Sequence, residues 1–468
     1  MYNINNKKKS FLFSLSVKGC IVLTLMFFTS CKKFVNIPLP DNQLTSDFVF
    51  SNDNSALGAL NGIYSKMIEN DQQFCSGYTT LFAGLSSDEL YYYTPSFRDE
   101  FLNNQISIAS QPNIESAFWS PCYQYIYAAN KCIESARNSD GMSSKMKRTT
   151  IGEAKFIRAF CYFYLVNLFG DVPLELSSVY QENQSIARSP AVKVYSQIID
   201  DLKGSIDSLD EIYASDDRGR PNKYAAVALL ARVYLYNYDW VDAENEATII
   251  INSGIYSMDN DLNSVFKSSS NETIWQLVPV NPYVNTWEGN EIIPYSIDAT
   301  PTYLLTNTLV NSFEAGDMRK LAWVQSENFS GQTIYYPYKY KINSGPPITE
   351  FYVVLRLAEQ YLIRAESRAN VDDIEGAQND LNAIRNRAGL SNTTAIDKTS
   401  LLKAIEHERQ IELFAEWGNR WFDLKRTGRA NTILGSLKPS TWQATDTLWP
   451  IPNSQILLNP SLKQNAGY

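Results

Sequence analysis

Apolar residues recur along most of the chain at the three- and four-residue spacing of a buried helix face. The segment 55–69 shows this pattern with Leu57, Leu60, Ile63, Tyr64, Met67 and Ile68. Comparable stripes cover residues 114–136, 150–169, 191–210, 222–237, 239–252, 353–369, 374–388 and 400–416. The spacing predicts a helix in each of these segments and therefore a mainly α fold.

Two helix pairs that are far apart in the sequence repeat one pattern of small and apolar residues. The first pair carries Ala231, Tyr234, Ala243, Ala247 and Ile250, and the second carries Ala365, Arg368, Ala377, Leu381 and Ile384 at the same offsets. Small residues where two antiparallel helices cross are typical of tetratricopeptide (TPR) repeats. Because one pair cannot bury both of its faces alone, we expect the distant pairs to stack in one array.

The helical pattern stops between about residues 255 and 350, where prolines interrupt the chain repeatedly. Two short runs there, 273–278 and 333–336, have the β-branched and aromatic composition of strands. The region is rich in Tyr and Trp, and a second aromatic stretch lies at residues 91–97. We expect helices to form the scaffold and these irregular segments to form a loop-rich, aromatic-bearing lobe that binds the ligand.

Composition and charge narrow the possible functions. The 468 residues carry a net charge of −9 without a basic block, which argues against binding of nucleic acid. Aromatic residues reach 13%, which favours aromatic packing, stacking on a flat ligand, or both. There is a single histidine and no G-x-S-x-G, H-E-x-x-H, Walker or dinucleotide-binding motif. We therefore predict no catalytic residue, no metal site and no cofactor.

The N-terminus has the pattern of a secretory signal. Basic residues precede an apolar run at 20–28, which is far shorter than the ~20 residues that a membrane-spanning helix needs. The small polar residues before Cys31 resemble the lipobox of bacterial lipoproteins, in which the cysteine is diacylated. We predict a lipoprotein signal peptide at 1–30, lipidation of Cys31 and a tether at 31–46. An ordinary signal peptide, an uncleaved anchor, or Cys20 as the acceptor are the alternatives.

Charged and sulfur-containing residues inside the helical stripes have structural interpretations. Arginines alternate there with glutamates: Arg158, Arg364, Arg385, Arg409 and Arg420 with Glu153, Glu359, Glu366, Glu408, Glu412 and Glu416. Because an unpaired buried charge is costly, the pattern predicts ion pairs between stacked helices. Four cysteines beyond Cys31 are too few for a disulfide framework, so we predict buried thiols at Cys75, Cys122, Cys132 and Cys161.

Several sequence motifs stand in a characteristic order. They are EAKFIRA at 153–159, GDVPL at 170–174, LRLAEQYLIRAE at 355–366, NAIRNRAG at 382–389, RWFDLKR at 420–426 and the closing LWPIP and NAGY at 448–452 and 465–468. Together they resemble the SusD-like (RagB/SusD) family of nutrient-binding lipoproteins from the outer membrane of Bacteroidetes. The resemblance covers the chain from Cys31 to its end.

The resemblance implies a SusD-like fold over 47–468. A TPR-like helical scaffold would occupy 47–254 and 351–430, an irregular insert 255–350, and a closing segment 431–468. The protein would be lipid-anchored in the outer membrane, facing the cell exterior. It would bind an oligo- or polysaccharide, or alternatively a peptide or glycopeptide, and deliver it to a TonB-dependent SusC-like transporter without acting as an enzyme.

Two other functions stay open on the residues alone. Asp88 and Glu89 are the best candidates for the two carboxylates that a glycoside hydrolase needs. A TPR protein scaffold is the second alternative, although it does not explain the aromatic segments. A glycan-binding protein does explain them, because the C–H faces of sugars stack on aromatic rings.

The resemblance also indicates where the ligand binds. In SusD-like proteins the loop after a D-E pair like Asp88-Glu89, and the segment before a D-x-R motif like Asp317 to Arg319, line the ligand face. The corresponding candidates are Tyr92, Tyr93, Phe97, Arg98, Tyr283, Trp287 and Tyr295. We single out Trp287 because its sequence neighbours are polar, so we expect an exposed ring. Its replacement by Ala should then weaken glycan binding about tenfold without changing the melting temperature.

Overall fold

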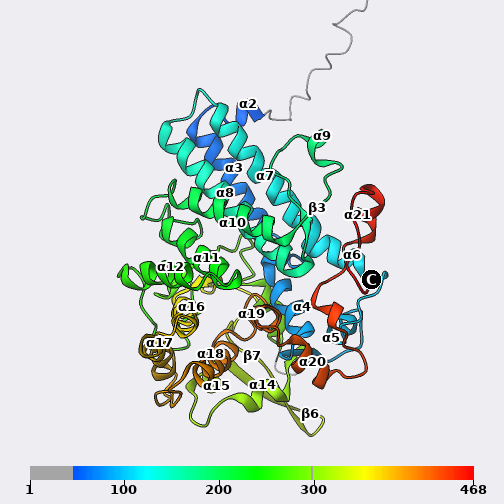
Figure 1. The fold of residues 1–468 in the computed structure, drawn as a ribbon, viewed down its shortest axis with the longest axis vertical. Coiled ribbons are helices and arrows are strands. Elements are labelled where there is room, and N and C mark those ends of the chain that lie inside the picture. Colours follow the sequence, from blue (N-terminus) through cyan, green and yellow to red (C-terminus); the bar gives the residue numbers. More distant parts are fainter. Residues whose placement is uncertain (1–45, 297–298) are drawn as a thin grey trace, which may run out of the picture. The chain divides into compact units, whose positions relative to one another are not determined.

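Helices carry most of the chain in the computed structural model, which describes residues 46–468 except 297 and 298 (Figure 1). The predicted signal peptide, the Cys31 lipidation site and the predicted tether up to residue 45 lie outside the described residues. The first half of the described chain contains α2 (Ser46–Val49), α3 (Asp53–Ile68), η2 (Phe74–Tyr78), α4 (Thr79–Ser86), β1 (Leu90–Tyr92), α5 (Arg98–Leu102), α6 (Gln111–Ile114), η3 (Glu115–Trp119), α7 (Ser120–Asn138), α8 (Ser144–Phe169), β2 (Val172–Pro173), α9 (Tyr180–Asn183), β3 (Arg188–Ser189), α10 (Ala191–Ile206), α11 (Lys223–Tyr236) and α12 (Trp240–Asn252).

Short strands and further helices make up the second half. The elements are β4 (Thr273–Leu277), α13 (Trp287–Ile292), β5 (Tyr303–Leu305), α14 (Asn307–Ser312), α15 (Met318–Trp323), β6 (Val324–Phe329), β7 (Gln332–Pro337), β8 (Tyr352–Arg356), α16 (Leu357–Asn370), α17 (Ile374–Arg387), α18 (Lys398–Leu413), α19 (Asn419–Arg426), α20 (Ala430–Leu437), η4 (Ala444–Thr447) and α21 (Asn453–Leu458). Within the described residues the strands pair in twos, all antiparallel: β1 with β5, β2 with β3, β4 with β8 and β6 with β7.

The helices form one continuous array although the irregular insert interrupts it in sequence. Helix α7 packs on α8, α8 on α10, α10 on α11 and α11 on α12. Helix α12, green in Figure 1, then packs against α16, in yellow, which in turn contacts α17 and α18. The small residues at the predicted helix crossings are fully buried: Ala231, Ala243, Ala247, Ala365 and Ala377. The predicted stacking of the two distant helix pairs is therefore confirmed.

One predicted helix begins later than its apolar pattern suggests. The stripe at 353–369 predicted a single helix, but its first four residues belong to β8 and α16 begins only at Leu357. Strand β8 pairs with β4, with Leu277 opposite Tyr352, and every residue of both strands is buried. A short apolar run suits a helix or a buried strand equally well, so the pairing with β4 decides the outcome. The two runs predicted as strands at 273–278 and 333–336 do form β4 and β7.

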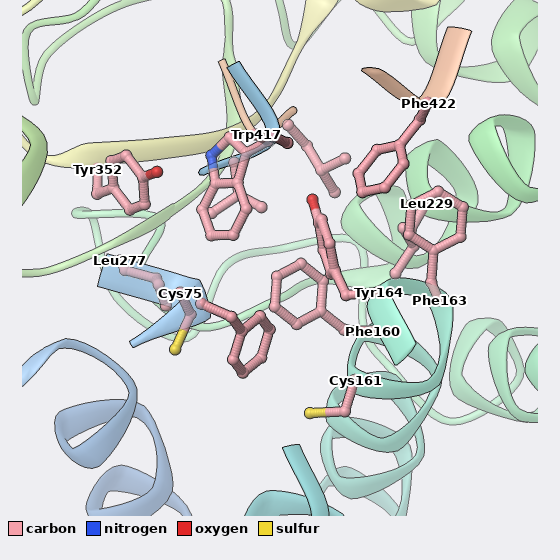
Figure 2. Close-up of a cluster of buried hydrophobic side chains, with 14 of the residues drawn as sticks. Cys75, Phe160, Cys161, Phe163, Tyr164, Leu229, Leu277, Tyr352, Trp417 and Phe422 are labelled. Carbon is pink, nitrogen blue, oxygen red and sulfur yellow. The ribbon is translucent and has the colours of Figure 1, made fainter. Parts of the chain in front are cut away.

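Aromatic side chains form the part of the core where the array meets the insert. Figure 2 shows Phe160 and Tyr164 of α8 pointing towards Trp417, and their ring centroids lie 5.6 and 5.5 Å from that of Trp417. Trp417 in turn stacks on Tyr352 of β8 at 4.7 Å. Aromatic pairs at such distances stabilise a core beyond the area that they bury. Much of the aromatic excess in the composition therefore serves packing.

The cysteines and the charged residues take the structural roles predicted for them. Cys75, Cys122, Cys132 and Cys161 are free and buried. Ion pairs join neighbouring helices, as between Arg158 of α8 and Asp201 of α10 at 2.7 Å, and between Arg232 of α11 and Glu359 of α16 at 2.6 Å. Asp201 is not among the acids named from the sequence pattern, because the partner of an arginine is the acid that lies opposite it on the neighbouring helix.

The densest ionic cluster joins the insert to α18 and surrounds Glu412. Its carboxylate accepts hydrogen bonds from Arg319 at 3.0 Å, from Arg356 at 2.6 Å and from Arg387. All four side chains are almost completely buried. Burial acts to raise the pKa of Glu412, but the three guanidinium groups hold it well below its usual range.

Candidate ligand-binding face

The first predicted segment brings Tyr92, Phe97 and Arg98 together with Tyr303. Tyr92 lies opposite Tyr303 in the β1–β5 pair, and their ring centroids are 4.9 Å apart. The Arg98 guanidinium lies 4.7 Å from the Tyr92 centroid and 4.9 Å from the Phe97 centroid, and its Nε donates a hydrogen bond of 2.6 Å to the Tyr303 hydroxyl. Cation–π contacts and this hydrogen bond fix the orientation of the guanidinium. We call these four residues the Arg98 cluster.

Two further polar groups border the Arg98 cluster. Burial, together with the negative charge of Glu291, raises the pKa of the Tyr78 hydroxyl to about 12, against an opposing effect of Arg98. Burial also raises the pKa of the Glu291 carboxyl, which Arg98 opposes as well. Tyr78 therefore stays a neutral hydroxyl at physiological pH. A cationic donor, a hydroxyl and a carboxyl thus lie close to one another beside aromatic rings.

Exposed aromatic rings lie on the two segments that carry this polar group. Tyr93 is 45% exposed, its ring meets Phe329 edge-on at 5.0 Å, and its backbone N–H donates to the carbonyl of Thr302. The Thr302 hydroxyl donates to the Glu291 carbonyl at 3.0 Å. Residue Tyr295, in the loop between α13 and Thr302, is 83% exposed. The structure therefore sets the 91–98 segment beside the C-terminal end of α13, which belongs to the second predicted segment.

Tyr283 and Tyr295 are not joined to the Arg98 cluster. Tyr283 is 65% exposed, and its carbonyl accepts a hydrogen bond from the backbone N–H of Gly345. Within the described ranges, neither ring makes a hydrogen bond or an aromatic contact with the cluster. Their predicted contact with the ligand stays a prediction.

The expectation that Trp287 is an exposed ring is wrong. The ring is half-buried against the core, and its indole N–H donates a hydrogen bond of 2.9 Å to the carbonyl of Ile68. Its polar neighbours Asn285, Thr286 and Glu288 are themselves buried, and Thr286 caps α13 through the N–H of Gly289. Polar sequence neighbours therefore indicated a buried hydrogen-bonded turn at this place, not a solvent-exposed loop.

Replacement of Trp287 by Ala should lower the free energy of unfolding by about 2–3 kcal/mol, because it removes half-buried aromatic area and leaves the Ile68 carbonyl without its donor. Urea unfolding followed by circular dichroism measures the change. The matched control is Tyr283→Ala at an exposed ring, for which we expect a change within about 0.5 kcal/mol. Equal unfolding midpoints for the two variants would contradict the packing role of Trp287.

Asp88 and Glu89, the carboxylate pair considered for hydrolysis, are both buried, and Asp88 forms an ion pair. Arg420 of α19 donates to both carboxylate oxygens of Asp88, each at 2.8 Å. Burial, together with the negative charge of Asp88, raises the pKa of Glu89 to about 8. The geometry thus gives Asp88 a structural role, in which it holds the chain just before the 91–98 segment against α19. Asp317 and Arg319, the second landmark of the predicted face, likewise lie in the buried ionic cluster around Glu412.

Sequence reasoning did not select Tyr78, Glu291 or Tyr303 as site residues. Tyr303 lies in the aromatic stretch ahead of Asp317, so that stretch could have indicated it. Tyr78 ends a short π-helical turn, and nothing in its local sequence distinguishes it from a core tyrosine.

No helix in the described part of the chain is long and apolar enough to span a membrane. The same part of the chain contains no group of three or more His, Cys, Asp or Glu side chains that could hold a metal ion.

Comparisons with known proteins agree with the fold. A family model described as the SusD family matches residues 285–468, and one described as "Starch-binding associating with outer membrane" matches residues 54–235. SusD-like protein P25 of Formosa agariphila is 23% identical over 97% of this chain and 100% of its own length. Starch-binding protein SusD of Bacteroides thetaiotaomicron is 24% identical over 76% of this chain and 81% of its own length.

Solved structures show the same architecture. A SusD superfamily protein from Bacteroides vulgatus superimposes with a TM-score of 0.79 at 20% identity, over 90% of this chain and all of that chain. A laminarin-binding SusD-like protein gives a TM-score of 0.72 at 23% identity, over 89% of this chain and all of that chain. Two matching family models, full-length relatives and a shared helical fold together show that the chain belongs to the SusD family.

Proposed function

We propose that the protein binds an oligo- or polysaccharide through the face around the Arg98 cluster and does not act as an enzyme. The observation that carries the proposal is a guanidinium fixed among aromatic rings, near the hydroxyl of Tyr78, in a segment that also carries the exposed ring of Tyr93. Sugar C–H faces stack on such rings at about 1 kcal/mol each, and sugar hydroxyls pair with fixed polar groups. The names of the relatives that bind starch and laminarin support this ligand class.

The predicted site residues take different parts in this proposal. Tyr93 and Arg98 contact the glycan, and Tyr92 and Phe97 hold the Arg98 guanidinium in place. Tyr295, in the loop after α13, adds a further ring on which the glycan stacks. Tyr283 and Trp287 border the same face, and Trp287 mainly packs against the core.

Delivery to a transporter is the second part of the proposal. A lipid on Cys31 anchors the protein in the outer membrane facing the cell exterior, and the bound glycan passes to a TonB-dependent SusC-like transporter. The sequence motifs support this, as does the family description that names association with the outer membrane. Two acyl chains on one cysteine provide the two signals that stable membrane attachment needs.

Glycan binding by wild type and by Tyr93→Ala and Arg98→Ala tests the proposal. We expect each variant to bind at least tenfold more weakly, or ~1.4 kcal/mol, because each removes a stacking ring or the fixed donor. Calorimetry against starch, laminarin, xylan and pectin oligosaccharides gives the affinities, and circular dichroism verifies folding. The control is Ile212→Ala at an exposed residue in the loop after α10.

Wild-type affinity in both variants would contradict this face. Release of shorter sugars from any glycan during incubation would instead favour the hydrolase alternative. Binding of peptides without binding of any glycan would favour a peptide ligand.

A further inference from the structure

A hollow of about 540 Å³ lies between α7, the loop around α9 and the C-terminal α21. In Figure 1 the labels of α9 and α21 stand on the same side of α7. The hollow, which we call the α7–α21 groove, shares no lining residue with the Arg98 cluster. It is therefore a site separate from the face proposed above.

Aromatic rings of different exposure line the α7–α21 groove. Trp119 is buried and Tyr123 is partly exposed, and their ring centroids lie 5.1 Å apart. Tyr127 and Tyr180 are 52% and 71% exposed. Within the described part of the chain, the hydroxyls of these two tyrosines make no hydrogen bond. Exposed rings together with buried ones in the lining of one groove are typical of sites that stack a flat or ring-shaped ligand.

Two polar side chains in the groove have unused hydrogen-bonding capacity. The Nδ2 of Asn183 donates to the Ser177 carbonyl at 2.7 Å, but its Oδ1 is buried without a donor. The Glu175 carboxyl has no hydrogen-bond partner among the described residues, and burial raises its pKa to about 7. A buried polar atom left unpaired costs about 1–3 kcal/mol, so a ligand that brings hydroxyl donors would relieve this cost.

The walls of the groove are fixed by hydrogen bonds to other elements. Asn130 of α7 donates to the carbonyls of Glu175 and Ser177, each at 3.1 Å. Asn459, which directly follows α21, donates to the carbonyl of Ile186 at 2.9 Å. The loop around α9 is thus tied to α7 on one side and to the C-terminal segment on the other. A preformed groove of this kind binds without a large cost for ordering its walls.

The chemistry of the lining selects the ligand. The lining residues include no Lys, Arg or His, but five amide side chains: Gln124, Asn183, Gln184, Gln455 and Asn459. Amides and tyrosines suit the hydroxyls and C–H faces of uncharged sugars, whereas an anionic sugar would meet no cation here and would approach Glu175. We propose that the α7–α21 groove is a second saccharide site that takes a segment of a neutral oligosaccharide. This inference rests on glycan binding as the proposed function.

The test compares two double variants and their combination. The groove variant carries Tyr127→Ala and Tyr180→Ala, and the face variant carries Tyr93→Ala and Arg98→Ala; all four side chains are at least partly exposed. The probes are maltoheptaose, laminarihexaose and xylohexaose, with tetragalacturonate as the anionic comparison. Calorimetry measures the affinity, and Ile212→Ala is the control.

We expect the face variant to retain binding of at least one neutral oligosaccharide. Adding the groove substitutions should weaken that residual binding at least tenfold, with unchanged circular dichroism. If the groove substitutions leave binding unchanged in both the wild type and the face variant, the second saccharide site is overturned. If the face variant has also lost binding, the proposed function still holds, because binding then depends on the Arg98 face alone. If the wild type binds only tetragalacturonate, and does so through Arg98, the groove assignment fails while the proposed function holds.

Discussion

Replacement of Glu412 by Ala should lower the free energy of unfolding by about 3–5 kcal/mol. Its carboxylate is the shared acceptor for Arg319, Arg356 and Arg387, all almost completely buried. Removing the acid leaves positive charges that lose their common partner in a dry interior, which costs far more than the loss of one hydrogen bond. Denaturant unfolding followed by circular dichroism measures the difference.

The matched control is Asp210→Ala. Asp210 also pairs with two cations, Lys145 at 3.5 Å and Arg148 at 3.2 Å, but all three side chains are largely solvent-exposed. Exposed ion pairs contribute about 0–1 kcal/mol, so this variant should unfold almost like the wild type. Similar losses in the two variants would mean that burial does not set the strength of the Glu412 cluster.

Replacement of Glu288 by Gln should remove a large part of the loss of stability that we expect between pH 5 and pH 8. Glu288 is buried in α13 and accepts a hydrogen bond of 3.0 Å from the Tyr352 hydroxyl. Burial raises its pKa to about 8, against about 4.3 in an unfolded chain. Between these two values the folded protein holds a proton that the unfolded chain releases, so stability falls as the pH rises through this window.

The expected size follows from about 1.4 kcal/mol for each unit of pKa difference, which gives roughly 5 kcal/mol across the whole window. Gln resembles the protonated acid and does not titrate. The free energy of unfolding of the Glu288→Gln variant should therefore fall less steeply than that of the wild type as the pH rises. Glu89, with a pKa raised to about 8, accounts for a comparable share, and the double Gln variant should have the flattest profile. The control is Glu69→Gln at an exposed position. Parallel profiles for wild type and Glu288→Gln would show that Glu288 is ionised in the folded protein.

The helical array could be predicted from the sequence because helix periodicity is a local property. Stripes such as the one in 55–69 correspond to helices within a few residues, and the repeated offsets correctly indicated stacking of α12 on α16. The error at 353–356 has a nonlocal cause, since the partner strand β4 lies far away in the sequence. A pattern of apolar residues does not contain that information.

The candidate site was less accessible to prediction for the same physical reason. The sequence could indicate the 91–98 segment because its aromatic run is continuous. It could not reveal that Trp287 donates to Ile68, or that Tyr303 orients Arg98, because these contacts join segments more than two hundred residues apart. Exposure of a single ring depends on such contacts and not on the polarity of its sequence neighbours.

The β4–β8 pair has a consequence for how proteins of this architecture can diversify. Because Leu277 lies opposite Tyr352, the chain leaves the scaffold and returns to it at neighbouring points, about 5 Å apart as in any paired strands. Recombination could exchange the intervening segment for one of another length without disturbing the contact between α12 and α16. An incoming segment would also have to supply an arginine at the place of Arg319, since Glu412 otherwise loses one of its three donors. Ligand preference can thus evolve separately from the scaffold, provided that the two buried charges which the segment contributes, Arg319 to Glu412 and Lys339 to Glu416, are preserved.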